Sequence, residues 1–172
     1  MNPIHPGLAP LARAAKTFSK ALRTTGGANK PELAAALRDA VGKNSGWLRA
    51  EHRVGDPTRY MRHVLYVDPD GAFVMTAITW LPGQVSPVHG HHVWCAFGVA
   101  EGELTEECFR QLDGNLVALK TNVYRPGDVA ERDFDRKGIH RVSNRSRGTI
   151  VSLHLYGVSA ERLTTGINRL YD

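Results

Sequence analysis

The feature that most constrains the fold is a long succession of short strand-like segments separated by strong turn sequences. It extends from Tyr60 to Tyr156, and Asp, Asn, Pro and Gly recur between the segments. The sequence DPDG at 68–71 predicts a hairpin between strands at 60–67 and 72–80. Many short strands with turns between them indicate an antiparallel sandwich or barrel. The other predicted strands cover residues 92–99, 103–111, 116–124, 128–134, 139–144 and 149–156.

The first fifty residues have a different pattern, which predicts helices. Gly26 and Gly27 end the first helix, and Pro31 begins the second. Fifty residues bury too little surface to be stable alone, so we expect a helical cap packed on the barrel. We therefore predict one domain over 1–172, with a cap at 1–52, a β-barrel core at 58–157 and a tail at 158–172. Apolar residues recur at three- and four-residue steps in both helices: Leu8, Leu11, Ala15, Phe18 and Leu22, then Leu33, Leu37 and Val41.

Composition excludes several classes of partner. The formal net charge is +5, but acidic and basic residues are interspersed, and the cluster Arg141, Arg145 and Arg147 is typical of a solvated hairpin. We therefore expect no nucleic-acid partner. No apolar run is long enough to span a membrane, and no signal peptide is evident, so we expect a cytoplasmic protein without a membrane partner. In that compartment Cys95 and Cys108 form no structural disulfide. The sequence contains no pattern that indicates an oligomeric state.

The sequence HGHH at 89–92 is the first candidate site. Side chains at i and i+2 of a strand share a face, so His89 and His91 point into the same space, and Cys95 has the same parity. Paired neutral imidazoles are suitable ligands for Zn, Cu, Fe or Ni. The alternative is a wet loop with incidental histidines. His92 has the opposite parity and is placed behind the site or on the surface.

A second pattern lies near the end of the chain, in GIHRVSN at 138–144 and VSLHLYG at 151–157. In the last strand Ser152, His154 and Tyr156 share one face, and the other face is entirely apolar. The apolar face must pack outward against protein, which leaves the polar stripe facing the barrel interior. Polar groups are costly there unless they are hydrogen-bonded to one another or to a ligand. The alternative is an edge strand with its polar side in water.

These motifs together resemble a known family. The spacing G-x5-H-x-H-x3-C-x6-G from Gly83 to Gly102 resembles the first cupin motif, with Cys95 where that motif has a glutamate. With GIHRVSN and VSLHLYG, the chain resembles the cysteine dioxygenase (thiol dioxygenase) family of the cupin superfamily. The resemblance implies a mainly β, cupin-type jelly-roll barrel with N-terminal α-helices.

The resemblance also implies a non-haem iron(II) enzyme of cysteine metabolism. His89, His91 and His140 would bind Fe(II), and both atoms of O₂ would be added to the sulfur of a small thiol to give a sulfinate. Iron(II) sites usually include a carboxylate. Three neutral histidines instead suit a substrate that supplies the anion itself, such as a thiolate.

Roles for other residues follow from the same resemblance. Arg62, with Tyr60, would bind the substrate carboxylate, since the planar guanidinium meets a carboxylate bidentately. Tyr156 would contact substrate or oxygen, with His154 and Ser152 orienting it. Some relatives join the positions of Cys95 and Tyr156 by a thioether, so a crosslink is one interpretation of Cys95. The other is that Cys95 is a small buried residue filling the space left by glutamate.

Several alternatives remain. Arg62 favours L-cysteine, while 3-mercaptopropionate and mercaptosuccinate are also compatible, although Thr165 stands where some 3-mercaptopropionate-type members have an arginine. A non-catalytic or sensory metal-binding cupin is a different class. An isomerase or hydrolase with another divalent metal, such as zinc, is a third. Trp80 and Trp94 are predicted to be packing residues.

Overall fold

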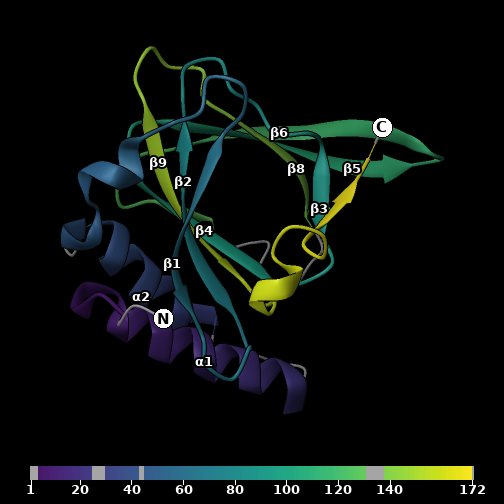
Figure 1. Ribbon diagram of the computed structural model, residues 1–172. Coiled ribbons are helices and arrows are strands. Elements are labelled where there is room, and N and C mark those ends of the chain that lie inside the picture. The colour runs from purple at the N-terminus through teal and green to yellow at the C-terminus, as the bar shows by residue number, and fades with distance from the viewer. Residues whose placement is uncertain (1–3, 25–29, 43–44, 131–137, 172) are drawn as a thin grey trace.

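The strands form two antiparallel five-stranded sheets that face one another, as the computed structural model shows (Figure 1). The structure describes residues 4–24, 30–42, 45–130 and 138–171. The first sheet has the order β1-β2-β9-β4-β7, with β1 Met61–Val67, β2 Val74–Trp80, β9 Ile150–Tyr156, β4 Cys95–Glu101 and β7 Val129–Ala130. The second has the order β10-β3-β8-β5-β6, with β10 Asn168–Leu170, β3 His89–His91, β8 Ile139–Ser143, β5 Leu104–Leu112 and β6 Asn115–Tyr124.

The helices precede the sheets in the chain, as the apolar periodicity predicts. The two α-helices are α1 Ala9–Thr24 and α2 Lys30–Val41. The predicted end of the first helix at Gly26 and Gly27 lies outside the described residues. Short 3-10 turns lie at Pro6–Leu8, Ser45–Trp47, Ala50–Arg53 and Ala160–Arg162.

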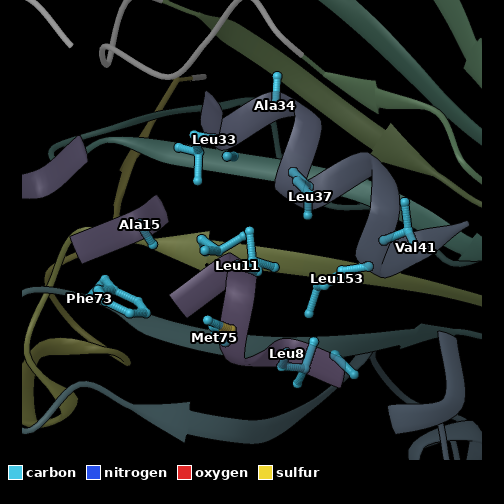
Figure 2. Packing of buried hydrophobic residues seen from close by; sticks show 14 of the residues in the cluster. Leu8, Leu11, Ala15, Leu33, Ala34, Leu37, Val41, Phe73, Met75 and Leu153 are labelled. Atoms are coloured by element: carbon cyan, nitrogen blue, oxygen red, sulfur yellow. The ribbon is translucent and has the colours of Figure 1, made fainter. Parts of the chain in front are cut away.

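Both α-helices pack on the outer face of the first sheet, away from the second (Figure 1). Leu11 of α1 and Leu37 of α2 approach Leu153 of β9 (Figure 2), and all three side chains are fully buried. These contacts form one hydrophobic cluster with β2 and β4 residues such as Met75 and Ala96. The first sheet therefore has protein on both faces, which is why β2 and β9 are buried along their whole length.

Strand β9 separates the two sides of this sheet. Val151, Leu153 and Leu155 belong to the cluster that includes the helices, and the alternate residues point between the two sheets. The predicted division of the strand is confirmed. The barrel interior thus receives a polar stripe that the helices cannot reach.

The hairpin predicted at 68–71 joins β1 to β2. Gly71 donates its backbone N–H to the Asp68 carbonyl oxygen at 2.9 Å and has φ +67°, a conformation that favours glycine. The Asp68 carboxylate accepts the backbone N–H groups of Asp70 and Ala72. The turn is therefore fixed by local hydrogen bonds, as its sequence predicts.

The chain differs from the predicted strands at three places. The strand predicted at 92–99 is observed as β4 but begins three residues later, at Cys95, because the chain forms β3 with the histidine motif itself and then crosses to the other sheet. Trp94 lies in that crossing, with its ring 5.0 Å from Phe18, edge to face. Of the strand predicted at 128–134, β7 is observed and residues 131–134 lie outside the described residues. Strand β10 lies in the tail, for which the sequence predicts no strand.

In the part of the chain that the structure describes, neither α-helix has the length and hydrophobicity needed to cross a membrane.

We expect Leu37→Ala to destabilise the protein, since this side chain is fully buried between α2 and the sheet. Removing such a group costs about 2–5 kcal/mol of unfolding free energy. Leu119→Ala is the control, because Leu119 on β6 is 55% exposed, and it should change stability by less than about 0.5 kcal/mol. Urea unfolding measures both. Equal effects would contradict the packing described for α2.

Candidate metal centre

Three histidine side chains meet between the two sheets. His89 and His91 lie on β3, and His140 lies on β8 directly opposite His89. One potential ligand atom from each lies within 4.8 Å of the others, and all three side chains are buried. His89 and His91 share a face, as their spacing predicts. The cluster could hold a metal ion.

Burial keeps the imidazoles of His89 and His91 uncharged. Removal from water, reinforced by the neighbouring His140, lowers the pKa of His89 to about 4. The same two effects lower the pKa of His91 to about 2. A neutral imidazole is the form that binds a metal, because one ring nitrogen then has a bare lone pair. Both rings are therefore ready to bind a cation near neutral pH.

Hydrogen bonds decide which nitrogen carries the lone pair. His89 Nδ1 lies 2.9 Å from the Pro87 carbonyl oxygen, which can only accept, so the proton is on Nδ1. His140 Nδ1 lies 2.7 Å from the Glu106 carboxylate, which holds the proton in the same place. His140 Nε2 is buried and has no hydrogen-bond partner among the described residues. The histidine nitrogens therefore fit a metal ion, since His140 Nε2 belongs to the cluster and faces its interior.

A second group of polar residues faces the histidines from the first sheet. Trp80 Nε1–H donates to Ser152 Oγ at 2.9 Å. Ser152 Oγ lies 2.8 Å from His154 Nε2, and His154 Nδ1 lies 3.3 Å from the Tyr156 hydroxyl oxygen. Burial lowers the pKa of His154 well below its usual value, so the ring is neutral and has one proton to share.

Trp80 starts this chain, because its indole N–H can only donate and the Ser152 hydroxyl oxygen accepts from it. When the Ser152 hydroxyl in turn donates to His154 Nε2, the His154 proton is on Nδ1, and the Tyr156 oxygen accepts from it and keeps its own proton to donate into the pocket. The opposite His154 tautomer reverses both hydrogen bonds of the ring. Burial raises the pKa of Tyr156, so the phenol keeps that proton near neutral pH.

Arg62 brings a positive charge to the same pocket. It lies on β1, with its guanidinium carbon 5.5 Å from the centre of the Tyr60 ring, and the Tyr60 ring stacks on Trp80 at 4.5 Å. The charge of Arg62 contributes to the lowered pKa values of His89 and His154. Its Nε atom is buried without a hydrogen-bond partner among the described residues. Arg62 therefore has a donor available for a ligand.

The pocket between these groups is small. Its empty space is no more than about 330 Å³, at the lower end of known ligand pockets. Asn168 of β10 also lines it, and its Oδ1 atom is buried without a partner among the described residues. A small ligand with both an anionic group and a hydrogen-bond donor would satisfy Arg62 and Asn168 together.

Cys95 also lines the pocket, directly opposite Tyr156 in the β4–β9 pairing. Residues paired in this way have neighbouring side chains on the same face. The two cysteines of the chain, Cys95 and Cys108, form no disulfide. Cys95 therefore lies in the same pocket as His89 and His91, but it reaches the pocket from the other sheet and not along the same strand. Its side chain lies beside the phenol.

Every residue that the sequence singles out as a site residue lies in this pocket or in its hydrogen-bonded wall, but three participants were missed. Trp80 was predicted to be a packing residue, and this is wrong in part, because its indole donates to Ser152 and lines the pocket. Glu106 shares the strand parity of the buried Leu104, which could have revealed that it faces inward. Asn168 offered no signal, since β10 was not predicted. Trp94 packs on Phe18 as predicted, and His92 is exposed.

Two facing antiparallel sheets with a histidine cluster between them define a cupin-type barrel. The chain belongs to the cysteine dioxygenase type I family, whose profile matches residues 27–163, most of its length. The family is that of a metal-dependent dioxygenase-type enzyme that acts on a small molecule and O₂.

Comparison with solved structures agrees with this fold. The protein TT1209 from Thermus thermophilus is 17% identical with a TM-score of 0.51, over 64% of this chain and 95% of that chain. Two further structures are similar at lower TM-scores. A protein with a double-stranded beta-helix domain from Klebsiella pneumoniae is 18% identical with a TM-score of 0.49, over 72% of this chain and 88% of that chain. A Cupin 2 conserved barrel domain protein from Salinispora arenicola is 19% identical with a TM-score of 0.45, over 68% and 89%.

We expect His140→Ala to abolish stable iron binding, because it removes the only nitrogen that β8 contributes to the cluster. Elemental analysis of protein loaded with iron(II) under anaerobic conditions and then desalted measures this. His92→Ala is the control, since His92 belongs to the same HGHH sequence but is exposed, and it should keep wild-type iron content. Full iron content in His140→Ala would contradict the assignment.

Proposed function

We propose that this protein is a non-haem iron(II) thiol dioxygenase that converts a small carboxylate-bearing thiol, preferably L-cysteine, to its sulfinate. The observation that carries the proposal is the pocket itself. It combines three histidine ligands with no carboxylate among them, an arginine whose Nε atom is buried without a partner among the described residues, and a buried phenol. Family membership supports it.

Iron(II) held by His89, His91 and His140 would supply open positions for the thiolate and O₂ and a path for electrons between them. The sulfur provides all the electrons that reduce O₂, so both oxygen atoms end on sulfur and no external reductant is required. A ligand set without a carboxylate leaves the metal its full charge, which favours an anionic sulfur ligand.

Arg62 would hold the substrate carboxylate. Its guanidinium can meet a carboxylate bidentately, and it is fixed against Tyr60, which in turn stacks on Trp80. Asn168 Oδ1 would accept a hydrogen bond from the substrate amino group, which L-cysteine has and 3-mercaptopropionate lacks. This difference favours the amino-acid substrate.

Tyr156 would donate its hydroxyl proton as a hydrogen bond to the substrate or oxygen in front of it. His154 and Ser152 would keep the phenol in that orientation, because the His154 ring lies at hydrogen-bond distance from both hydroxyl groups. Trp80 starts the chain by filling a Ser152 acceptor position. These residues hold a proton at the Tyr156 oxygen rather than remove it, since burial raises that pKa.

A sensory or non-catalytic cupin would also bind a metal through three histidines. It would have no need for a chain of hydrogen bonds that ends on a buried phenol beside the cluster.

Mercaptosuccinate and 3-mercaptopropionate remain substrates to test against L-cysteine, because both present a carboxylate to Arg62.

Oxygen uptake by iron-loaded protein, measured with a panel of thiols, tests the proposal. L-cysteine should give the highest kcat/KM, and a thiol without a carboxylate, such as cysteamine, should be a poor substrate. Stoichiometric uptake with a sulfinate product supports the proposal. Iron binding without thiol-dependent uptake for any member of the panel would favour the sensory alternative.

Arg62→Ala should weaken turnover of carboxylate-bearing thiols more than that of cysteamine. Losing a charge-assisted hydrogen bond costs about 1.5–3 kcal/mol, roughly ten- to a hundredfold in affinity. Arg62→Lys should restore part of the loss, because lysine keeps the charge without the planar fork. Arg59→Ala is the control, since Arg59 is exposed and pairs with Asp56. Equal losses for both kinds of thiol would show that Arg62 is not the anchor.

We further propose that Cys95 and Tyr156 form a thioether during turnover. Cross-strand pairing sets the two side chains side by side. The C–S bond would form with loss of one hydrogen atom from the thiol and one from the phenol ring, that is two protons and two electrons in all, and O₂ would be the oxidant that takes them up as hydrogen peroxide. Intact mass should fall by two hydrogens after turnover, and peptides containing Cys95 and Tyr156 should elute as one. Cys95→Ser is the control that should show no loss. Separate peptides, with Cys95 alkylated after unfolding, would leave only a packing role.

A further inference from the structure

A buried carboxylate lies directly behind one of the three histidines. Glu106 of β5 is 1% exposed, and its Oε1 atom accepts a hydrogen bond from His140 Nδ1 at 2.7 Å. Strands β5 and β8 are paired, with Glu106 opposite Val142, so the contact is diagonal across two neighbouring strands. The carboxylate touches the far side of the imidazole from the cluster and does not belong to the cluster itself.

The second carboxylate oxygen is also satisfied. Glu106 Oε2 accepts from Asn122 Nδ2 at 2.9 Å and from the Tyr124 hydroxyl at 2.8 Å, both on β6. At each of these contacts Glu106 accepts the hydrogen bond, so both of its oxygens act only as acceptors, as those of an ionised carboxylate do. Glu106 is therefore an ionised group built into the barrel wall at considerable cost in desolvation. A purely structural position would be filled more easily by an apolar residue.

We infer that Glu106 is a positioning residue for the metal: through His140 it fixes the ring, holds the lone pair on Nε2 and makes that nitrogen a stronger donor. The inference rests on the proposed metal site. Carboxylates that accept from the second nitrogen of a metal-bound histidine have these effects generally. The three ligands include no carboxylate, but the carboxylate of Glu106 contacts one of them, His140, from the side away from the cluster.

The three ligands are consequently unequal. His89 Nδ1 donates to a neutral carbonyl oxygen, that of Pro87, whereas His140 Nδ1 donates to a full negative charge. His140 is the more electron-rich ligand, and it transmits part of the Glu106 charge to the metal. More charge on the ligands stabilises the oxidised metal, so Glu106 should lower the reduction potential of bound iron.

Glu106→Gln tests the inference, with Glu107→Gln as the matched control. Glu107 is the next residue on β5, but it faces outward and pairs with Arg141 and Arg145. Cobalt(II) affinity is measured for the whole protein by competition with a chromophoric chelator. Glu106→Gln should weaken binding about ten- to a hundredfold, whereas Glu107→Gln should match wild type. Equal affinity in all three proteins would overturn the inference.

Tyr124→Phe provides a test whose sign separates electronic tuning from structural support. It removes a donor to Glu106 and leaves the His140 contact in place, so more negative charge is available to His140. The midpoint potential of bound iron should therefore fall in Tyr124→Phe and rise in Glu106→Gln. Shifts in the same direction would mean that both variants only loosen the wall, and the inference would be wrong.

The outcomes distinguish this inference from the proposed function. Wild-type protein that binds neither cobalt(II) nor iron(II) overturns both. Wild-type binding with thiol oxidation, but no effect of Glu106→Gln, overturns only the role of Glu106. If Glu106→Gln does not fold, Tyr124→Phe decides alone: a lower potential supports the inference, and an unchanged or higher potential contradicts it.

Discussion

The burial of three imidazole rings against one another is the constraint on which the rest of this structure depends. Removing them from water keeps His89 and His91 uncharged because it lowers the pKa of each ring, and hydrogen bonds on the outer nitrogens of His89 and His140 leave lone pairs facing inward. Buried polar atoms without partners are unfavourable in a folded protein. The Nε2 atom of His140, which has no hydrogen-bond partner in the part of the chain that the structure describes, is therefore suited to a cation held by this cluster.

The two sheets contribute different groups to this site. The second sheet carries the histidine cluster and, behind it, Glu106. The first sheet carries most of the groups that would contact substrate, among them Arg62 and Tyr156, and the second sheet adds Asn168 of β10. Because the helices cover its outer face, the first sheet is held from both sides, and its polar interior stripe keeps a fixed position. The helical cap, whose described residues include no site residue, thus stabilises the sheet that would orient the substrate.

Most of the correct predictions about the site came from strand parity, the alternation of side chains between the two faces of a strand. It placed His89 with His91 and aligned Ser152, His154 and Tyr156 on the inner face, because a period of two is a local property. The contacts that were missed join segments far apart in the chain. Glu106 meets His140 across 34 residues and Trp80 meets Ser152 across 72, and such pairings depend on strand order, which no local pattern encodes. The crossing between sheets after His91 was missed for the same reason.

The fate of molecular oxygen tests the central claim most directly. Iron-loaded protein would be given L-cysteine under ¹⁸O₂, and the sulfinate product would be examined by mass spectrometry. A thiol dioxygenase predicts that both oxygen atoms of the sulfinate carry the label and come from the same O₂ molecule, as a mixture of ¹⁶O₂ and ¹⁸O₂ would show. A product that is disulfide, or a sulfinate labelled at one oxygen only, would contradict the account.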